Sequence, residues 1–213
     1  MSIADKLQTI AENEQKVFDA GKKDEQTQFW EIFQDGGKRN GYSMTFMSKY
    51  WNDTNYNPIY TLKNDSGNQM FQQTYVTDTK VPIDISTAGV NHSSLFAYSS
   101  RIQTIRKLIT AKDKGYTGDF ASCSGLKNIS FEGEIGRSID FKSCPLTVES
   151  MKDVIEHLYD YATNDPDNAN KYTVTFSSAC WEALEASGSP SDEIEGCECD
   201  TWQNHVISLG WGV

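Results

Sequence analysis

Residues 120–129 read Phe-Ala-Ser-Cys-Ser-Gly-Leu-Lys-Asn-Ile, and related phrases stand on both sides of them. The earlier phrase, at 96–105, reads Phe-Ala-Tyr-Ser-Ser-Arg-Ile-Gln-Thr-Ile, and a shortened later one, at 141–148, reads Phe-Lys-Ser-Cys-Pro-Leu-Thr-Val. The residues that open the phrases, Phe96, Phe120 and Phe141, are therefore 24 and 21 positions apart. A repeat of this length is one supersecondary unit that buries its apolar face only against neighbouring units. The middle of the chain is accordingly predicted to be a stack of such units.

Each phrase leads into a short stretch that is typical of a β-strand. The expected strands are Ile102–Leu108, Leu126–Phe131 and a short Leu146–Val148. In the second stretch, Leu126, Ile129 and Phe131 alternate with polar residues, which predicts one buried and one exposed face. Cys123 and Cys144 occupy equivalent positions of the phrase, where cysteine acts as a small buried hydrophobe.

The chain divides around these repeats into two parts, and the expected class is α+β. An N-terminal helical segment spans 1–39. The rest, 40–213, holds an aromatic β-rich cap, the repeats at about 83–148 and a C-terminal cap at 149–213. The strands expected in the first cap are Tyr42–Phe46, Ile59–Leu62 and Val81–Ile85.

The C-terminal cap is expected to open with a helix capped by Thr147. The inner stripe of this helix is Met151, Val154, Ile155, Leu158 and Ala162. A strand Tyr172–Phe176, a short helix Ala179–Glu185, an acidic loop 186–200 and a final strand Val206–Leu209 are expected to follow.

Four apolar residues near the N-terminus are spaced as on one side of a helix, namely Ile3, Leu7, Ile10 and Val17. A helix of about 20 residues is marginal by itself in water and needs a partner. It either packs on its own domain or self-associates as a coiled coil. In the second case these residues assemble the chain into a weak homo-oligomer or dock it on a larger particle.

The charge of the chain favours a protein partner. The formal net charge is −11, and the sequence lacks the basic stripe of a nucleic-acid binder. No Lys or Arg follows Lys171, whereas seven acidic residues do. This acidic run is either a solvated loop or a surface that binds a basic partner. In the second case the contact residues are Glu193, Glu195, Glu198 and Asp200.

An aromatic pair in the first cap is a second candidate for partner binding. Tyr50 and Trp51 stand among further aromatic and Asn residues between 40 and 84. They form either a ligand platform or the cover over the exposed end of the first repeat.

Five cysteines and the opening residues indicate a chain made in a cytoplasm with reduced thiols. The opening Met-Ser-Ile-Ala-Asp-Lys lacks the apolar stretch of a signal peptide, and no membrane insertion is expected. A zinc set of Cys180, Cys197, Cys199 and His205 has a Cys-x-Cys spacing instead of the usual Cys-x-x-Cys. We therefore expect neither a metal nor another cofactor. Since no catalytic signature stands at a recognised spacing, the chain is expected not to be an enzyme.

The repeat phrases resemble the BspA-like leucine-rich repeats of bacterial surface proteins, in which Phe-x-x-Cys-x-x-Leu-x-x-Ile recurs about every 23 residues. This resemblance implies that the repeats form a short leucine-rich-repeat-like solenoid, closed by a helix and strands. The stretches 2–7, 11–21, 29–34, 129–136 and 146–158 also resemble hypothetical proteins of phages and prophages of gut Firmicutes. That resemblance implies a phage-encoded protein in or near the tail. The Cys- and Glu-rich run 186–200 departs from the usual ending of those proteins.

These observations lead to two functional hypotheses. The first is a non-enzymatic phage protein of the virion tail or baseplate that acts as a binding or adhesion module for host interaction. The alternative is an intracellular phage inhibitor of a host defence protein, an anti-CRISPR or similar protein, acting through its acidic surface. Both place synthesis in the bacterial cytoplasm, and both require a protein partner.

Overall fold

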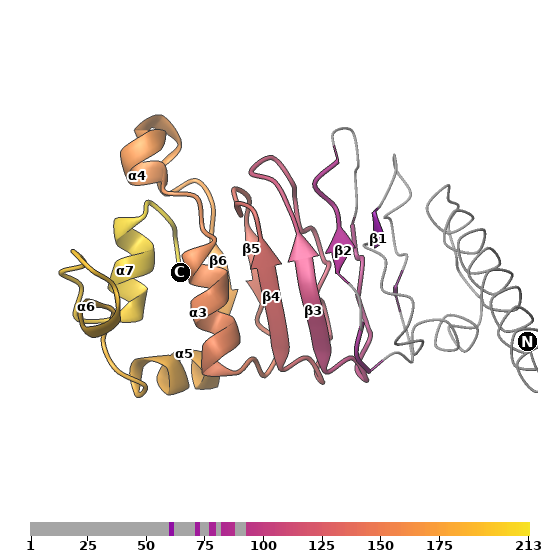
Figure 1. Cartoon of the computed structure of the whole chain (residues 1–213). Helices are drawn as coiled ribbons and strands as arrows, with labels where there is room; N and C mark the ends of the chain where they lie inside the picture. Colours follow the sequence, from indigo (N-terminus) through magenta and orange to yellow (C-terminus); the bar gives the residue numbers. More distant parts are fainter. Residues whose placement is uncertain (1–59, 62–70, 73–76, 80–81, 88–92) are drawn as a thin grey trace, which may run out of the picture.

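The computed structural model describes residues 60–61, 71–72, 77–79, 82–87 and 93–213. This part of the chain is mixed α and β, with small parallel sheets followed by short helices (Figure 1). The mixed class predicted from the sequence is thereby confirmed. Several predictions lie outside the described residues, namely the assembly stripe Ile3, Leu7, Ile10 and Val17, the strand Tyr42–Phe46, and the aromatic pair Tyr50 and Trp51.

Four short parallel strands form the main sheet, side by side in sequence order (Figure 1). They are β1 (Tyr60–Thr61), β2 (Ile83–Asp84), β3 (Thr104–Ile109) and β4 (Asn128–Glu132). A second sheet pairs β5 (Ile139–Phe141) with β6 (Val174–Phe176), again in parallel. All of these strands except β5 were predicted, with ends that differ by one or two residues. In β4 the predicted alternation holds, since Ile129 and Phe131 are buried and their neighbours are not. In β3 the register shifts between Ile105 and Leu108, which lie buried opposite Ile129 and Phe131.

Five buried phenylalanine rings stack on one another through the core. They are Phe71, Phe96, Phe120, Phe141 and Phe176, with successive ring centroids 5.2, 6.0, 4.5 and 5.9 Å apart. Three of them open the phrases seen in the sequence, so equivalent positions in the sequence are neighbours in space. The sequence analysis missed the two outer rings. Phe71 precedes Phe96 by 25 residues, an interval that was available as a signal, whereas Phe176 follows Phe141 by 35 residues and keeps no period.

A row of side-chain hydrogen bonds runs along this stack. In each phrase, the third residue after the phenylalanine donates to the carbonyl oxygen of the preceding phenylalanine of the stack. The pairs are Ser99 with Phe71 (2.7 Å), Cys123 with Phe96 (3.0 Å) and Cys144 with Phe120 (3.6 Å). Cys123 and Cys144 are buried, as predicted. Their thiols therefore fill the core and also satisfy backbone carbonyl groups that are closed to water.

Successive turns approach so closely that one position requires glycine. A β-carbon on Gly125 would lie 2.3 Å from the carbonyl oxygen of Ser100. The same two turns are joined by a backbone hydrogen bond of 2.7 Å from the N–H of Tyr98 to the carbonyl of Ala121. The glycine thus lets neighbouring turns stay in hydrogen-bonding contact.

The third phrase ends in a helix, so the predicted strand Leu146–Val148 is wrong. Thr147 is an N-cap whose hydroxyl accepts from the N–H of Ser150, and α3 (Val148–Glu156) follows directly. The cap was predicted, but the inner stripe was drawn too long. The helix ends at Glu156, Leu158 is buried just beyond it, and Ala162 is exposed in a separate short helix, α4 (Tyr161–Asn164).

The C-terminal region is built from further short helices. These are the 3₁₀ turn η2 (Pro166–Asn168), α5 (Ser178–Glu185), α6 (Pro190–Glu193) and α7 (Trp202–Ser208). The short helix at Ala179–Glu185 is confirmed, and the acidic loop 186–200 contains α6. The final strand predicted at Val206–Leu209 is wrong because α7 occupies most of it.

The start of α7 explains this error. Thr201 is the N-cap and accepts from the N–H of Asn204. In addition, the carboxylate of Glu185, on α5, accepts from the N–H groups of Trp202 and Gln203 at 2.9 and 3.0 Å. Three N–H groups of the first turn are thereby satisfied, one of them locally and two by a tertiary contact that no local pattern reveals.

Candidate binding groove at the C-terminal helices

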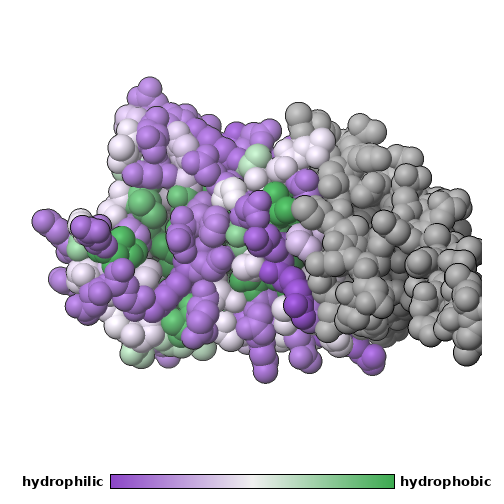
Figure 2. Space-filling model, in the orientation of Figure 1, coloured by the Kyte–Doolittle hydropathy of each residue, from purple (hydrophilic) through white to green (hydrophobic). Residues whose placement is uncertain are grey.

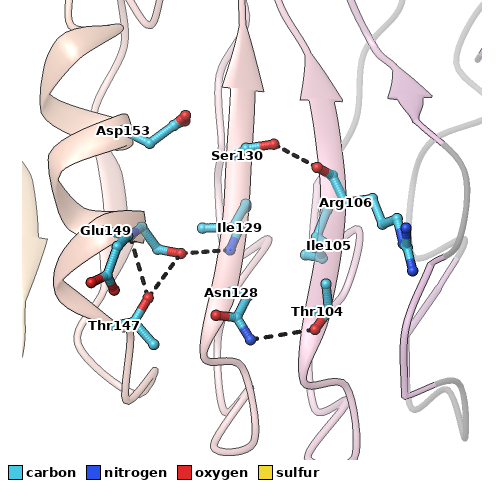
Figure 3. A pocket seen from close by; sticks show the side chains of 10 residues that line it. Thr104, Ile105, Arg106, Asn128, Ile129, Ser130, Thr147, Glu149 and Asp153 are labelled. Carbon is cyan, nitrogen blue, oxygen red and sulfur yellow. Dashed lines mark hydrogen bonds between the residues drawn. The ribbon is translucent and has the colours of Figure 1, made fainter.

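One hollow lies over β3, β4 and the start of α3 (Figure 3). Its volume is about 340 Å³, and most of the residues that line it are of polar types. Thr104 and Arg106 on β3, Asn128 and Ser130 on β4, and Glu149 on α3 contribute to it. The hydroxyl of Ser130 donates to the carbonyl of Arg106, so this lining joins the two strands across the sheet.

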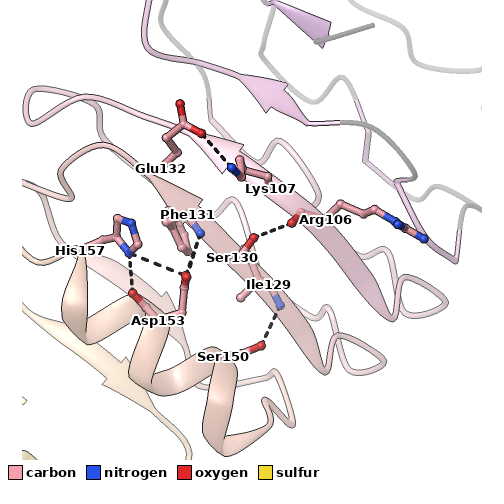
Figure 4. A network of polar contacts seen from close by, with 9 residues as sticks. All are labelled: Arg106, Lys107, Ile129, Ser130, Phe131, Glu132, Ser150, Asp153 and His157. Carbon is pink, nitrogen blue, oxygen red and sulfur yellow. Dashed lines mark hydrogen bonds and ion pairs between the residues drawn. The ribbon is translucent and has the colours of Figure 1, made fainter. Parts of the chain in front are cut away.

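Beside this hollow, α3 covers the free edge of β4. The hydroxyl of Ser150 accepts from the N–H of Ile129, and the carboxylate of Asp153 accepts from the N–H of Phe131, each at 2.9 Å (Figure 4). In a larger sheet these N–H groups would pair with carbonyls of a fifth strand. A helix with two acceptors at the right spacing ends the sheet instead and blocks pairing with another chain.

Several charged side chains near the hollow are paired within the molecule, and Figure 4 shows part of this network. Lys107 binds Glu132 at 2.9 Å, Arg106 binds Asp78 at 3.2 Å, and the ring of His157 lies 3.7 Å from the carboxylate of Asp153. Burial raises the pKa of Asp153, although its hydrogen bond from Phe131 and the neighbouring His157 oppose this. These groups hold the sheet and α3 together, so we assign the hollow a structural role.

The larger hollow lies between the C-terminal helices, and we call it the C-terminal groove. Its volume is about 740 Å³. Its apolar side chains are Ile155, Leu158, Ile194, Trp202 and Leu209, and its polar ones are Lys152, Glu156, Asp160, Glu193, Glu195 and His205. They come from α3, from the segment after it, from the end of α6 and from α7. The groove therefore combines an apolar floor with a charged rim.

The rim of the C-terminal groove carries an excess of negative charge. Four carboxylates line it against one lysine, and Lys152 is already bound to Glu193 at 2.7 Å and lies over the ring of Trp202 at 5.1 Å. Trp202 is fixed by its indole N–H, which donates to the carbonyl of Gly188 at 2.9 Å. Around the C-terminal helices the surface is largely hydrophilic, with small separate apolar patches (Figure 2). The carboxylate of Asp160 caps α4 by accepting from the N–H of Thr163 at 2.9 Å. The carboxylates of Glu156 and Glu195 are the charges left for a ligand.

The structure divides the four acidic residues singled out in the sequence. Glu193 and Glu195 lie on the rim of the C-terminal groove, whereas Glu198 and Asp200 are exposed on the loop beyond it. Glu156 and Asp160 were not predicted from the sequence, where they precede Glu193 by 37 and 33 positions. Trp202 was not predicted to line a binding site either. Its position between the acidic loop 186–200 and His205 was the signal in the sequence that could have indicated it.

The cysteines separate into a buried group and a surface pair. Cys180 is buried, and its thiol lies 3.4 Å from the carbonyl oxygen of Cys144, away from the other members of the zinc set weighed in the sequence. Cys197, Cys199 and His205 do come together, with their ligand atoms all within 4.8 Å of one another. Burial raises the pKa of Cys199 and lowers that of His205. These three side chains are able to hold a metal ion.

Comparison with protein-family models, with curated proteins and with solved structures yields no match to this chain. Within the described residues, no helix combines the length and the apolar character needed to cross a bilayer.

Proposed function

We propose that the chain is a non-enzymatic protein-binding module whose C-terminal groove takes a segment of a partner protein. The segment carries an apolar side chain next to Lys or Arg. The observation that supports this is the combination of an apolar floor with the exposed carboxylates of Glu156 and Glu195. An apolar side chain gains from burial on the floor, while a neighbouring cation meets the rim.

The platform behind the groove is a short leucine-rich-repeat-like solenoid that spans about 83–148. Parallel strands in sequence order support this assignment, together with the phenylalanine stack and the row of Ser and Cys hydrogen bonds. In such a stack each turn is held by its neighbours, so the platform is stiff and the groove at its end keeps its shape without a partner.

The phage particle is the site of action in this proposal. It rests on the resemblance of the chain to phage and prophage proteins, and the partner is then a tail or baseplate component or a host surface protein. Mass spectrometry of purified virions tests this part, since a virion protein is found in them at a fixed copy number.

The alternative is an intracellular inhibitor that occupies a host defence protein. The acidic C-terminal region favours it, because no Lys or Arg follows Lys171 and such a surface competes for a basic site. Absence of the chain from virions, with recovery of one host protein by the tagged chain from infected cells, would favour this function over the first.

A peptide library displayed on a surface tests the groove itself. We expect the immobilised full-length chain to select peptides with an aliphatic or aromatic residue next to Lys or Arg. The double variant Glu156→Lys/Glu195→Lys should weaken the selected peptides at least about tenfold, because two attractive charges become repulsive. It leaves the ion pair of Lys152 and Glu193 in place.

The matched control is Glu134→Lys/Glu182→Lys, which changes the net charge equally at exposed positions outside the groove lining. Its affinity for the selected peptides should stay within about twofold of wild type. If both double variants lost the same affinity for the peptides, net charge alone would explain the effect, and the groove would not be the binding site.

A further inference from the structure

Two thiols and one imidazole meet at the surface beside α7. Cys197 and Cys199 stand on the loop between α6 and α7, and His205 stands on α7 itself. The three residues are half-buried, and the Sγ atom of Cys197 lies 3.5 Å from the Nδ1 atom of His205. All three ligand atoms lie within 4.8 Å of one another.

The local chain geometry explains why they meet. Gly196 has a positive φ of 78°, and Cys197 and Cys199 follow it with one residue between them. Thr201 then starts α7, and the N–H of His205 donates to the carbonyl of Thr201 one helical turn later. Because residues four apart share one side of a helix, the first turn of α7 returns His205 to the side where the loop arrives.

These two cysteines differ from the three in the core. The thiols of Cys123, Cys144 and Cys180 lie against backbone carbonyls inside the molecule. The thiols of Cys197 and Cys199 lie against side chains instead, the imidazole of His205 and the hydroxyl of Ser208. Core packing therefore explains the three buried cysteines, but it does not explain why Cys197 and Cys199 stand beside a histidine.

We propose that Cys197, Cys199 and His205 form a site for a thiophilic divalent cation, with Zn²⁺ as the ion that fits best. With Zn–S of about 2.3 Å and Zn–N of about 2.0–2.1 Å, a tetrahedral ion separates sulfur and nitrogen ligands by about 3.5 Å. That is the separation between Cys197 and His205. The site is independent of the proposed peptide binding and does not rest on it.

The charge around the site also suits a cation. Glu195, Glu198 and Asp200 alternate with the cysteines along the loop. Two thiolates neutralise a divalent ion, and the neighbouring carboxylates attract it further. On binding, each thiol releases its proton to solvent while the imidazole binds in its neutral form, so the affinity falls at acid pH.

Three protein ligands leave one tetrahedral position open. Structural zinc sites close all four positions, whereas sites that bind an external group keep one open. Since His205 also lines the C-terminal groove, the metal site borders the groove. Water or a donor atom of another molecule would complete the coordination.

The experiment uses the reduced full-length chain with any affinity tag removed, titrated with Co²⁺ and then with Zn²⁺. We expect one equivalent of Co²⁺ to bind with the absorption bands of a tetrahedral thiolate complex, and Zn²⁺ to displace it. Cys197→Ser, Cys199→Ser and His205→Asn should each weaken Co²⁺ binding at least about tenfold. Zn²⁺ should also raise the thermal midpoint of wild type and not that of these variants.

Cys180→Ala is the matched control. The sequence alone makes Cys180 a possible fourth ligand, whereas in the structure its thiol lies at the carbonyl of Cys144, away from the other three residues. It should bind Co²⁺ like wild type, provided that its near-ultraviolet circular dichroism shows the native fold. The proposal is overturned by a folded, reduced wild-type chain that binds less than one equivalent. It is equally overturned by unchanged affinity in His205→Asn, or by loss of binding in a folded Cys180→Ala chain.

Discussion

The repeat region, 93–147, and the C-terminal region, 148–213, are held together in different ways. In the first, the same contacts recur, as the phenylalanine stack and the row of Ser and Cys hydrogen bonds show. In the second, contacts occur once each, such as the carboxylate of Glu185 at the start of α7 and the indole N–H of Trp211 on the carbonyl of Tyr159. Recurring contacts join each unit of the repeat region to the next in the same way. In the C-terminal region each contact joins one particular pair of elements.

The same division appears in charge and in the cysteines. Lys and Arg occur throughout the repeat region and are absent after Lys171. The repeat region keeps both of its cysteines in the core, whereas the C-terminal region has, besides the buried Cys180, a half-buried pair next to a histidine. Both surfaces that we propose for binding accordingly lie in the C-terminal region, and the repeats support them.

The largest expected effect is a difference in thiol reactivity between the two groups of cysteines. Burial raises the pKa of Cys123 to about 11 and raises that of Cys144 further, so few thiolates form in the native state. These two and Cys180 should react with a thiol reagent at least about a thousandfold more slowly than Cys197 and Cys199, because they must wait for opening of the core.

Mass spectrometry of alkylated peptides over time measures this at each site in metal-free protein. Two fast and three slow cysteines are expected, and all five should be fast in denaturant. Fast labelling of Cys123 in native protein would mean that the repeat region opens easily and would end the contrast between the two regions.

The sequence predicted the repeat region well because its information is local and repeated. Intervals of 24 and 21 residues place Phe96, Phe120 and Phe141 in one stack, and a short alternation is enough to predict β4. The C-terminal region has no period. There Val206–Leu209 was predicted to be a strand, whereas the cap by Thr201 and the tertiary contact between Glu185 and Trp202 support a helix.

The candidate metal site also depends on α7. His205 stands just before the predicted strand Val206–Leu209, and that prediction did not fix its direction relative to the loop. In α7 it lies one turn after the cap, on the side of Cys197. The expectation that no metal binds was drawn from Cys-x-Cys spacing and included Cys180, which the core holds apart. The sequence analysis already considered His205 as a ligand, but its position next to Cys197 and Cys199 depends on tertiary structure.

The next prediction concerns the centre of the phenylalanine stack. Phe120→Ala should lower the free energy of unfolding by roughly 3–5 kcal/mol, the usual cost of emptying a buried aromatic site. Its ring lies between those of Phe96 and Phe141, so two stacking contacts are lost. Urea denaturation measures the effect, and Phe120→Leu is the control that keeps most of the volume and should cost less than half as much. An unchanged urea midpoint of unfolding in Phe120→Ala would show that the phenylalanine stack does not stabilise the repeat region.

A smaller loss is expected where one contact joins two helices. Glu185→Ala should lower the free energy of unfolding by about 2 kcal/mol, because Trp202 and Gln203 lose the acceptor of their N–H groups. Glu185→Gln keeps one acceptor oxygen and should lose about half as much. Glu182→Ala, on the exposed side of the same helix, should change stability by less than about 0.5 kcal/mol. Equal effects at 182 and 185 would show that α7 does not depend on this cap.

The smallest effect is expected at the boundary between the two regions, where α3 covers β4. Asp153→Ala should cost about 1–2 kcal/mol, because the N–H of Phe131 loses its acceptor in a partly buried place. Asp153→Asn keeps an acceptor and carries no charge that burial disfavours, so it should lie within about 0.5 kcal/mol of wild type at neutral pH. Thermal denaturation of the three proteins measures both differences.

The pH dependence of stability in wild type and Asp153→Asn tests whether burial of the carboxyl group causes the difference between them. Burial raises the pKa of Asp153 above its ordinary value of 3.8, so the folded chain binds this proton more tightly than the unfolded one. The contribution of the carboxyl to stability is therefore largest below pH 3.8 and declines as the pH rises through the raised pKa. The stability of wild type minus that of Asp153→Asn should fall across this window and be constant above it. A difference that rises with pH would mean that the pairing with His157 outweighs burial, and α3 would then be held to the repeat region mainly by charge.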